Sequence, residues 1–157
     1  MTSQFDIVAT ETGLSSPPDG LGVNPYEVLI VASLIEEEAA LDEERAKIAR
    51  VIYNRLDRSI PLGIDATIVY ALGGDRELTL SDLAVDSPYN TRLVSGLPPT
   101  PISAPGRASI EAALQPAQGD WLYYVRTDES GVGSHTFTVT QEDFNEAVLI
   151  CIERDLG

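Results

Sequence analysis

The sequence predicts an α+β fold: a single domain of several helices packed with a small antiparallel β-hairpin and a long proline-rich loop. Three observations support this prediction. Apolar residues recur at helical spacing in the first half of the chain and at its end, and five prolines fall between positions 88 and 105. Near residue 130, two short segments rich in aromatic and β-branched residues flank a glycine-containing turn. With 157 residues, the chain can bury a core without disulfides or a structural metal.

The N-terminal part divides into a turn-rich stretch and two helices. Residues 1–22 hold serines, prolines and glycines without a sustained period, so we expect a tail or linker there and the domain itself over residues 23–157. Asn24 is a good N-cap and Pro25 a good first helical residue, which predicts a helix to about residue 40. Asp42 can cap a second helix that ends before Pro61. The two helices should pack as a pair.

The middle of the chain is expected to be poor in regular structure. Asp65 can cap a short helix that two glycines end, and Thr79 with Asp82 has the capping pattern of another. The segment 86–104 should be an ordered loop, because its prolines interrupt both helices and strands. Pro105 is expected to begin the next helix.

The C-terminal part predicts a hairpin followed by a helix. Residues 121–127 and 135–139 should pair as antiparallel strands, with Trp121, Tyr123 and Val125 on the opposite face from Leu122 and Tyr124. A final helix follows the capping pattern that begins at position 140, and its apolar spacing predicts a buried face. That face comprises Phe144, Val148, Cys151 and Ile152.

Composition excludes several classes of function. The formal net charge of −15 would repel a nucleic-acid backbone, so we expect no nucleic-acid binding. The same charge would weaken docking on an anionic membrane surface, and no apolar run approaches the roughly 20 residues of a membrane span. We therefore expect no membrane contact by this segment itself. Cys151 is the single cysteine, which rules out an intrachain disulfide.

The acidic run 36–38 contains a carboxyl group that the helical period places on an apolar face. At 100° per residue, Glu38 falls between Leu34 and Ile35, whereas Glu36 and Glu37 point elsewhere. We expect Glu38 to be partly buried between this helix and the proline-rich loop. Desolvation would raise its pKa, as a glycosidic general acid requires. The alternative is a solvated helix end, which an acidic triplet taken alone favours.

Short motifs continue in order from about residue 32 to residue 145. They include Ala32-Ser33-Leu34-Ile35-Glu36-Glu37-Glu38-Ala39, Asn54-Arg55-Leu56, Ser87-Pro88-Tyr89-Asn90-Thr91, Gly96-Leu97-Pro98-Pro99, Leu122-Tyr123-Tyr124-Val125 and His135-Thr136-Phe137. Together they resemble the catalytic domain of the endolytic peptidoglycan transglycosylases known as the MltG or YceG-like family. The resemblance implies that Glu38 is the catalytic residue. Glu37 departs from the pattern, since the family usually has lysine there.

The resemblance also implies a reaction. Such enzymes cleave the β-1,4 bond between N-acetylmuramic acid (MurNAc) and N-acetylglucosamine (GlcNAc) without water, leave a 1,6-anhydroMurNAc end and limit the length of nascent strands. One carboxyl, that of Glu38, can make both proton transfers, and no metal or organic cofactor is required. The implied partners are peptidoglycan glycan strands and cell-wall synthases.

The family places a membrane anchor and a LysM-like region before this domain, and neither is recognisable here. We therefore expect the catalytic segment of a protein tethered at the extracytoplasmic face of the bacterial cytoplasmic membrane.

Five further side chains are candidates for substrate contact. Tyr89, Asn90 and Thr91 can hydrogen-bond sugar hydroxyl or acetamido groups, although turn formation explains them equally well. Asp65 is a candidate at the cleft, although capping its helix is the simpler explanation. His135, the single histidine, is expected to make a polar contact at the hairpin or cleft edge.

Two rival functions remain open. A non-catalytic peptidoglycan-binding or scaffold domain would keep the loop but would not need a desolvated carboxyl. A conventional glycan hydrolase would combine Glu38 with a second acid such as Asp65 and would leave a free reducing end.

Overall fold

The computed structural model describes residues 3–128 and 131–156. Its elements confirm the α+β class. They are α1 (Gln4–Thr12), α2 (Pro25–Glu38), α3 (Arg45–Asp57), α4 (Asp65–Ala71), α5 (Arg107–Leu114), β1 (Tyr123–Arg126), β2 (His135–Thr138) and α6 (Gln141–Glu153), with 3-10 turns η1 (Asp19–Leu21), η2 (Asp42–Glu44) and η3 (Asp82–Ala84). No helix in these ranges is both long enough and apolar enough to cross a membrane.

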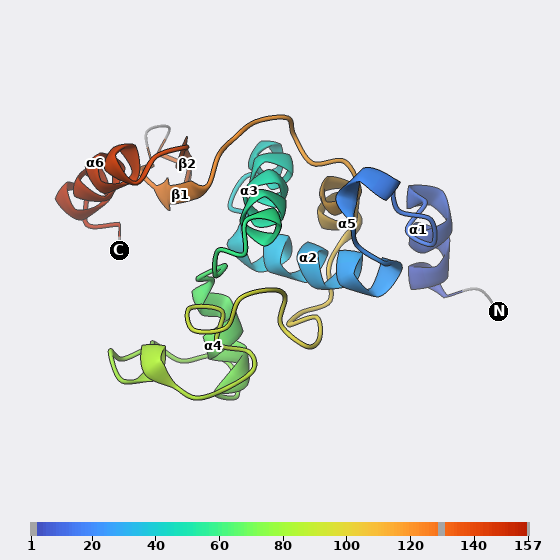
Figure 1. Cartoon of the computed structure of the whole chain (residues 1–157), viewed down its shortest axis with the longest axis horizontal. Helices are drawn as coiled ribbons and strands as arrows, with labels where there is room; N and C mark the ends of the chain where they lie inside the picture. The colour runs from blue at the N-terminus through green and yellow to red at the C-terminus, as the bar shows by residue number, and fades with distance from the viewer. Residues whose placement is uncertain (1–2, 129–130, 157) are drawn as a thin grey trace.

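Helix α2 is the centre of the fold. Asn24 caps it by accepting a hydrogen bond from the Glu27 backbone N–H, and its residues from Ile30 to Ile35 are buried. It packs against α5, α3 and α4. In Figure 1 it runs through the middle of the molecule, with α1 near one end and the hairpin with α6 beyond the other. Because α2 is enclosed along most of its length, its C-terminal residue has a fixed position.

Residues 3–14 are not the tail that the sequence suggested. Helix α1 is capped by Ser3, whose hydroxyl accepts a hydrogen bond from the Asp6 backbone N–H in a capping box, and it packs against α5. Val8 and Leu14 are buried in the main core. The sequence did not predict this helix, because it buries only Val8 and its apolar period is therefore weak.

The predicted antiparallel hairpin is confirmed, with strands shorter than expected, and it separates two faces. Trp121 lies outside β1, and its ring contacts Phe137 rather than the Tyr123 face that the sequence suggested. The strands are antiparallel with Tyr124 opposite Phe137, and these two rings pack against the helical core. On the other face, Tyr123 stacks on Phe144 of α6 with ring centroids 5.1 Å apart. Alternation along β1 therefore points one tyrosine toward the core and the next toward α6.

Two expectations at helix level need correction. Ile152 of α6 is 67% exposed rather than buried, because α6 packs mainly against the hairpin and buries a narrow stripe that includes Cys151. Helix α5 begins at Arg107, not at Pro105, and its N-cap is Gly106. Glycine has no side chain to cap the helix, so that capping group must come from elsewhere.

Candidate active site

Glu38 is the last residue of α2, and it lines a pocket of about 350 Å³. The lining comes from six separated parts of the chain and includes Arg55, Asp65, Arg92 and Tyr124. The side chain is partly buried, as expected. The proline-rich loop contributes Arg92, but α3, α4, β1 and α6 form most of the enclosure.

The pocket changes the acid strength of Glu38. Burial is the main cause that raises its pKa from the ordinary 4.5 to about 7. The negative charge of Asp65 and, to a smaller extent, that of Glu37 act in the same direction, while a hydrogen bond from Tyr124 partly opposes them. A carboxyl with a pKa near 7 can both donate and accept a proton at neutral pH.

Glu36, two residues earlier, makes contacts that hold helices of the fold together. Its carboxylate accepts hydrogen bonds from Ser109 and from the Gly106 backbone N–H at 3.3 Å, and it pairs with Arg45 at 3.3 Å. Glu36 is therefore the group that satisfies the N-terminus of α5 in place of a local cap. Its neighbour Glu37 is exposed.

Tyr124 is a site residue that sequence reasoning did not single out. Its hydroxyl faces Glu38, and burial together with the nearby carboxyl raises the pKa of Tyr124 well above its usual value. His135 packs edge-on against the Tyr124 ring, with centroids 5.6 Å apart. The buried carboxylate of Glu44 in turn bonds both the Nδ1 atom and the backbone N–H of His135, each at 2.8 Å.

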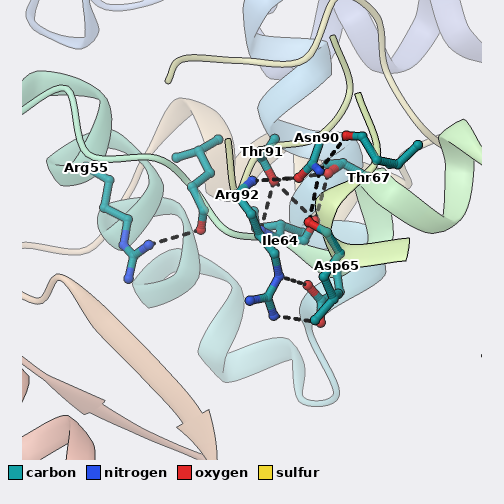
Figure 2. Close-up of polar contacts among 10 residues, drawn as sticks. Arg55, Ile64, Asp65, Thr67, Asn90, Thr91 and Arg92 are labelled. Carbon is teal, nitrogen blue, oxygen red and sulfur yellow. Dashed lines mark hydrogen bonds and ion pairs between the residues drawn. The ribbon is translucent and has the colours of Figure 1, made fainter. Parts of the chain in front are cut away.

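Asp65 does not cap α4, so that simpler explanation is wrong. It is the first residue of the helix, the N-cap is Ile64, and no side chain caps this end. Instead, Arg92 binds both carboxylate oxygens of Asp65, through Nε at 2.6 Å and Nη2 at 3.1 Å. Figure 2 shows the two side chains pointing toward one another.

Comparisons with known proteins identify the family of the chain. The model of the YceG-like family matches residues 1–149. The chain belongs to the YceG-like family. It is 44% identical over 126 residues to the endolytic murein transglycosylase of Bacillus subtilis (strain 168), covering 80% of this chain and 34% of the relative.

Two further matches point to the same family. The endolytic murein transglycosylase of Streptococcus pneumoniae serotype 2 is 38% identical over 128 residues, which cover 78% of this chain and 23% of that one. The crystal structure of a yceG-like protein from Listeria monocytogenes matches with a TM-score of 0.79 and 38% identity, over 90% of this chain and 45% of that chain. The chain thus spans about a third or less of the curated relatives' length.

In this YceG-like chain, the loop candidates do not reach the pocket. Asn90 is 0% and Thr91 2% exposed, and their polar groups bond within the protein. These buried bonds give both residues a structural role in the loop, and substrate contact through them stays a prediction. The Tyr89 hydroxyl bonds Thr100, and its ring packs on Tyr70 outside the pocket.

Arg55 joins the parts of the chain that enclose the pocket. Its guanidinium donates to the carbonyl of Leu122 at 2.6 Å, just before β1, and to those of Pro61 and Leu62 at 2.8 and 3.1 Å. One side chain therefore links α3 to the segment before α4 and to the residue that precedes the hairpin.

A larger cavity, of about 510 Å³, lies near the N-terminal end of α2. Its lining includes Tyr26, Tyr53 and Pro98. Its carboxyl groups are those of Glu27 and Asp57, and Glu27 accepts the Asn24 backbone N–H in the capping box of α2. The smaller pocket is the better candidate because it holds the carboxyl with the raised pKa.

Proposed function

We propose that the chain is the catalytic domain of an endolytic murein transglycosylase, with Glu38 as both its acid and its base. The observation that carries this proposal is a carboxyl with a pKa of about 7 in a pocket at the end of a buried helix. Its relatives are named for the same activity.

The reaction needs two proton transfers at one site. The protonated Glu38 carboxyl donates to the bridging oxygen of the β-1,4 bond, and the bond from that oxygen to the anomeric carbon of MurNAc breaks. The 6-hydroxyl oxygen of the same MurNAc then bonds to the anomeric carbon while the Glu38 carboxylate accepts its proton. The products are a strand with a free 4-hydroxyl on GlcNAc and a strand with a 1,6-anhydroMurNAc end. Glu38 is again protonated, and no water is consumed.

The site supports this reaction better than its rivals. A binding or scaffold domain gains nothing from a carboxyl whose burial raises its pKa. A hydrolase would need Asp65 to activate water, but both Asp65 oxygens already accept hydrogen bonds from Arg92.

The proposal extends to the parent protein. We infer that it acts at the extracytoplasmic face of the cytoplasmic membrane, where it limits the length of nascent strands next to cell-wall synthases. This placement follows from the substrate, since murein lies outside that membrane.

The decisive experiment is digestion of purified, uncrosslinked glycan strands in oxygen-18 water, followed by mass spectrometry. The expected products end in 1,6-anhydroMurNAc, one water lighter than hydrolytic products and without heavy oxygen. Glu38→Gln should abolish them, and Glu37→Gln, at an exposed neighbouring position, should not. Heavy oxygen at the new anomeric end would overturn the transglycosylase proposal, whereas full activity of Glu38→Gln would overturn the residue assignment.

A further inference from the structure

A second carboxyl group shares the pocket with Glu38. Asp65 is the first residue of α4 and lines the same pocket as the last residue of α2. Arg92 holds it in a bidentate ion pair, although the side chains of Asp65 and Arg92 are 49% and 43% exposed. The two carboxyl groups therefore act on one enclosed volume from separate elements.

The ion pair is backed by a buried hydrogen-bond network. Thr91, next to Arg92, accepts from the Ile64 backbone N–H at 2.9 Å through its hydroxyl and from that of Gly63 at 2.9 Å through its carbonyl. The Thr67 hydroxyl lies 3.0 Å from that of Thr91, and both residues are buried. Figure 2 shows these hydrogen bonds next to the Asp65–Arg92 pair, above it in this view.

This support is greater than an ordinary surface ion pair has. Such pairs usually contribute little to stability, because two long side chains lose rotamer freedom to form them. Here the residue before each partner is fixed by buried bonds, so the loop and α4 present Asp65 and Arg92 in a set geometry. A role in the pocket accounts for this arrangement better than stabilisation does.

We propose that Asp65, held by Arg92, is the fixed negative charge of the pocket, which stabilises the positive charge that develops on the anomeric carbon and assists both proton transfers of Glu38. The inference rests on the proposed function. Before cleavage, the charge of Asp65 favours the protonated form of Glu38. As the glycosidic bond breaks, the same charge faces an oxocarbenium-like centre. After cleavage, it makes the Glu38 carboxylate a stronger base toward the 6-hydroxyl.

The other charged and titratable groups near Glu38 do not take this role. Glu37 lies on the same helix but is exposed, and it affects the Glu38 pKa less than Asp65 does. Tyr124 acts in the opposite direction. Arg55 is occupied by three backbone carbonyls. Arg92 acts through Asp65, whose oxygens it binds, and the His135 and Glu44 pair lies behind Tyr124.

The test compares two substitutions with opposite expected signs. In Asp65→Asn, a carbon-13 titration of the Glu38 carboxyl should give a pKa lower by roughly 0.5 to 1 unit, because a like charge is removed. In Arg92→Gln the pKa should rise, because the cation that partly neutralises Asp65 is gone. Arg76→Gln is the matched control: it breaks another Arg–Asp pair, with Asp82, outside the pocket, and should leave the Glu38 pKa unchanged.

Kinetics test the second part of the proposal. Asp65→Asn should lower kcat by about 10-fold to 100-fold with little change in KM, and its remaining products should still be anhydro-ended. An unchanged Glu38 pKa in folded Asp65→Asn, or an unchanged kcat, would contradict the proposed role. The titration needs no turnover, so it reads the coupling between the two carboxyl groups even if wild-type products prove hydrolytic and the proposed function fails.

Discussion

Glu36 and Glu38 are two residues apart on one helix, yet the structure gives them opposite environments. Glu36 receives hydrogen bonds from Ser109 and Gly106 and an ion pair from Arg45, which tie the end of α2 to the start of α5 and to α3. Glu38 has burial and the charge of Asp65, which favour its protonated form. The comparison shows that the partners supplied by other elements decide whether a glutamate holds the fold together or acts as an acid.

The largest expected effect is on catalytic activity, where substitutions of the two glutamates should differ most. Glu38→Gln should lower kcat by roughly 10² to 10⁴-fold, because an amide cannot transfer the proton. Glu36→Gln, measured at a temperature where it is folded, should retain most of the activity. Turnover of uncrosslinked strands by both variants checks this prediction, and equal losses would show that the two carboxylates do not have separate roles.

The second effect concerns the free energy of unfolding, which the two substitutions should change in opposite directions. Glu36→Gln should lower the free energy of unfolding by about 1 to 2 kcal/mol, since charge-assisted bonds to α5 are weakened. Glu38→Gln at pH 8 should raise it by about 1 to 3 kcal/mol, because a partly buried charge is removed. Urea denaturation of both variants measures the difference.

The pH dependence of that second effect has a definite sign. The Glu38 pKa is about 7 in the folded chain and about 4.5 when unfolded, so the unfolded chain loses the proton first as the pH rises. The contribution of the protonated Glu38 side chain to the free energy of unfolding is therefore fully present below pH 4.5 and is lost as the pH rises to about 7. The gain in Glu38→Gln relative to the wild type should grow across this interval and level off above it. A gain of the same size at pH 4 would contradict the assignment.

A smaller effect is expected at Tyr124. Because its hydrogen bond lowers the Glu38 pKa, Tyr124→Phe should raise that pKa further and reduce kcat by about 10-fold near neutral pH. Tyr123→Phe is the matched control, since this neighbouring ring stacks on Phe144 on the opposite face of the hairpin. A pH profile of kcat that moves to lower pH in Tyr124→Phe would contradict the expected rise of the Glu38 pKa.

The smallest expected effect is at the exposed Glu37. Glu37→Lys, which introduces the residue usual in the family, removes a like charge and adds a cation near Glu38. The Glu38 pKa should fall by a few tenths of a unit, with kcat changing by about twofold or less, because solvent screens an exposed charge. A loss comparable to that of Glu38→Gln would show that the acidic run acts as a unit.

The sequence predicted what local periodicity can determine. The place of Glu38 on an apolar face, the α2 cap at Asn24 and the alternation along β1 each follow from a few adjacent residues. It did not predict contacts between distant elements. Arg92 lies 27 residues from Asp65 and Ser109 lies 73 residues from Glu36, and no local pattern marks such pairs. The tail prediction over residues 1–22 was wrong over α1 because a helix that buries one residue has almost no period.

The long connection between α5 and β1 has a consequence for how the site can be lost. The hairpin and α6 join the helical core across an irregular segment, and Arg55 and Glu44 are among the side chains that anchor them. A local unfolding event confined to this C-terminal unit would remove Tyr124 and Phe144 from the pocket and expose Glu38 to water, while α2, α3 and α5 stayed folded. Amide exchange in the hairpin, rather than global melting, should therefore follow the temperature at which activity disappears.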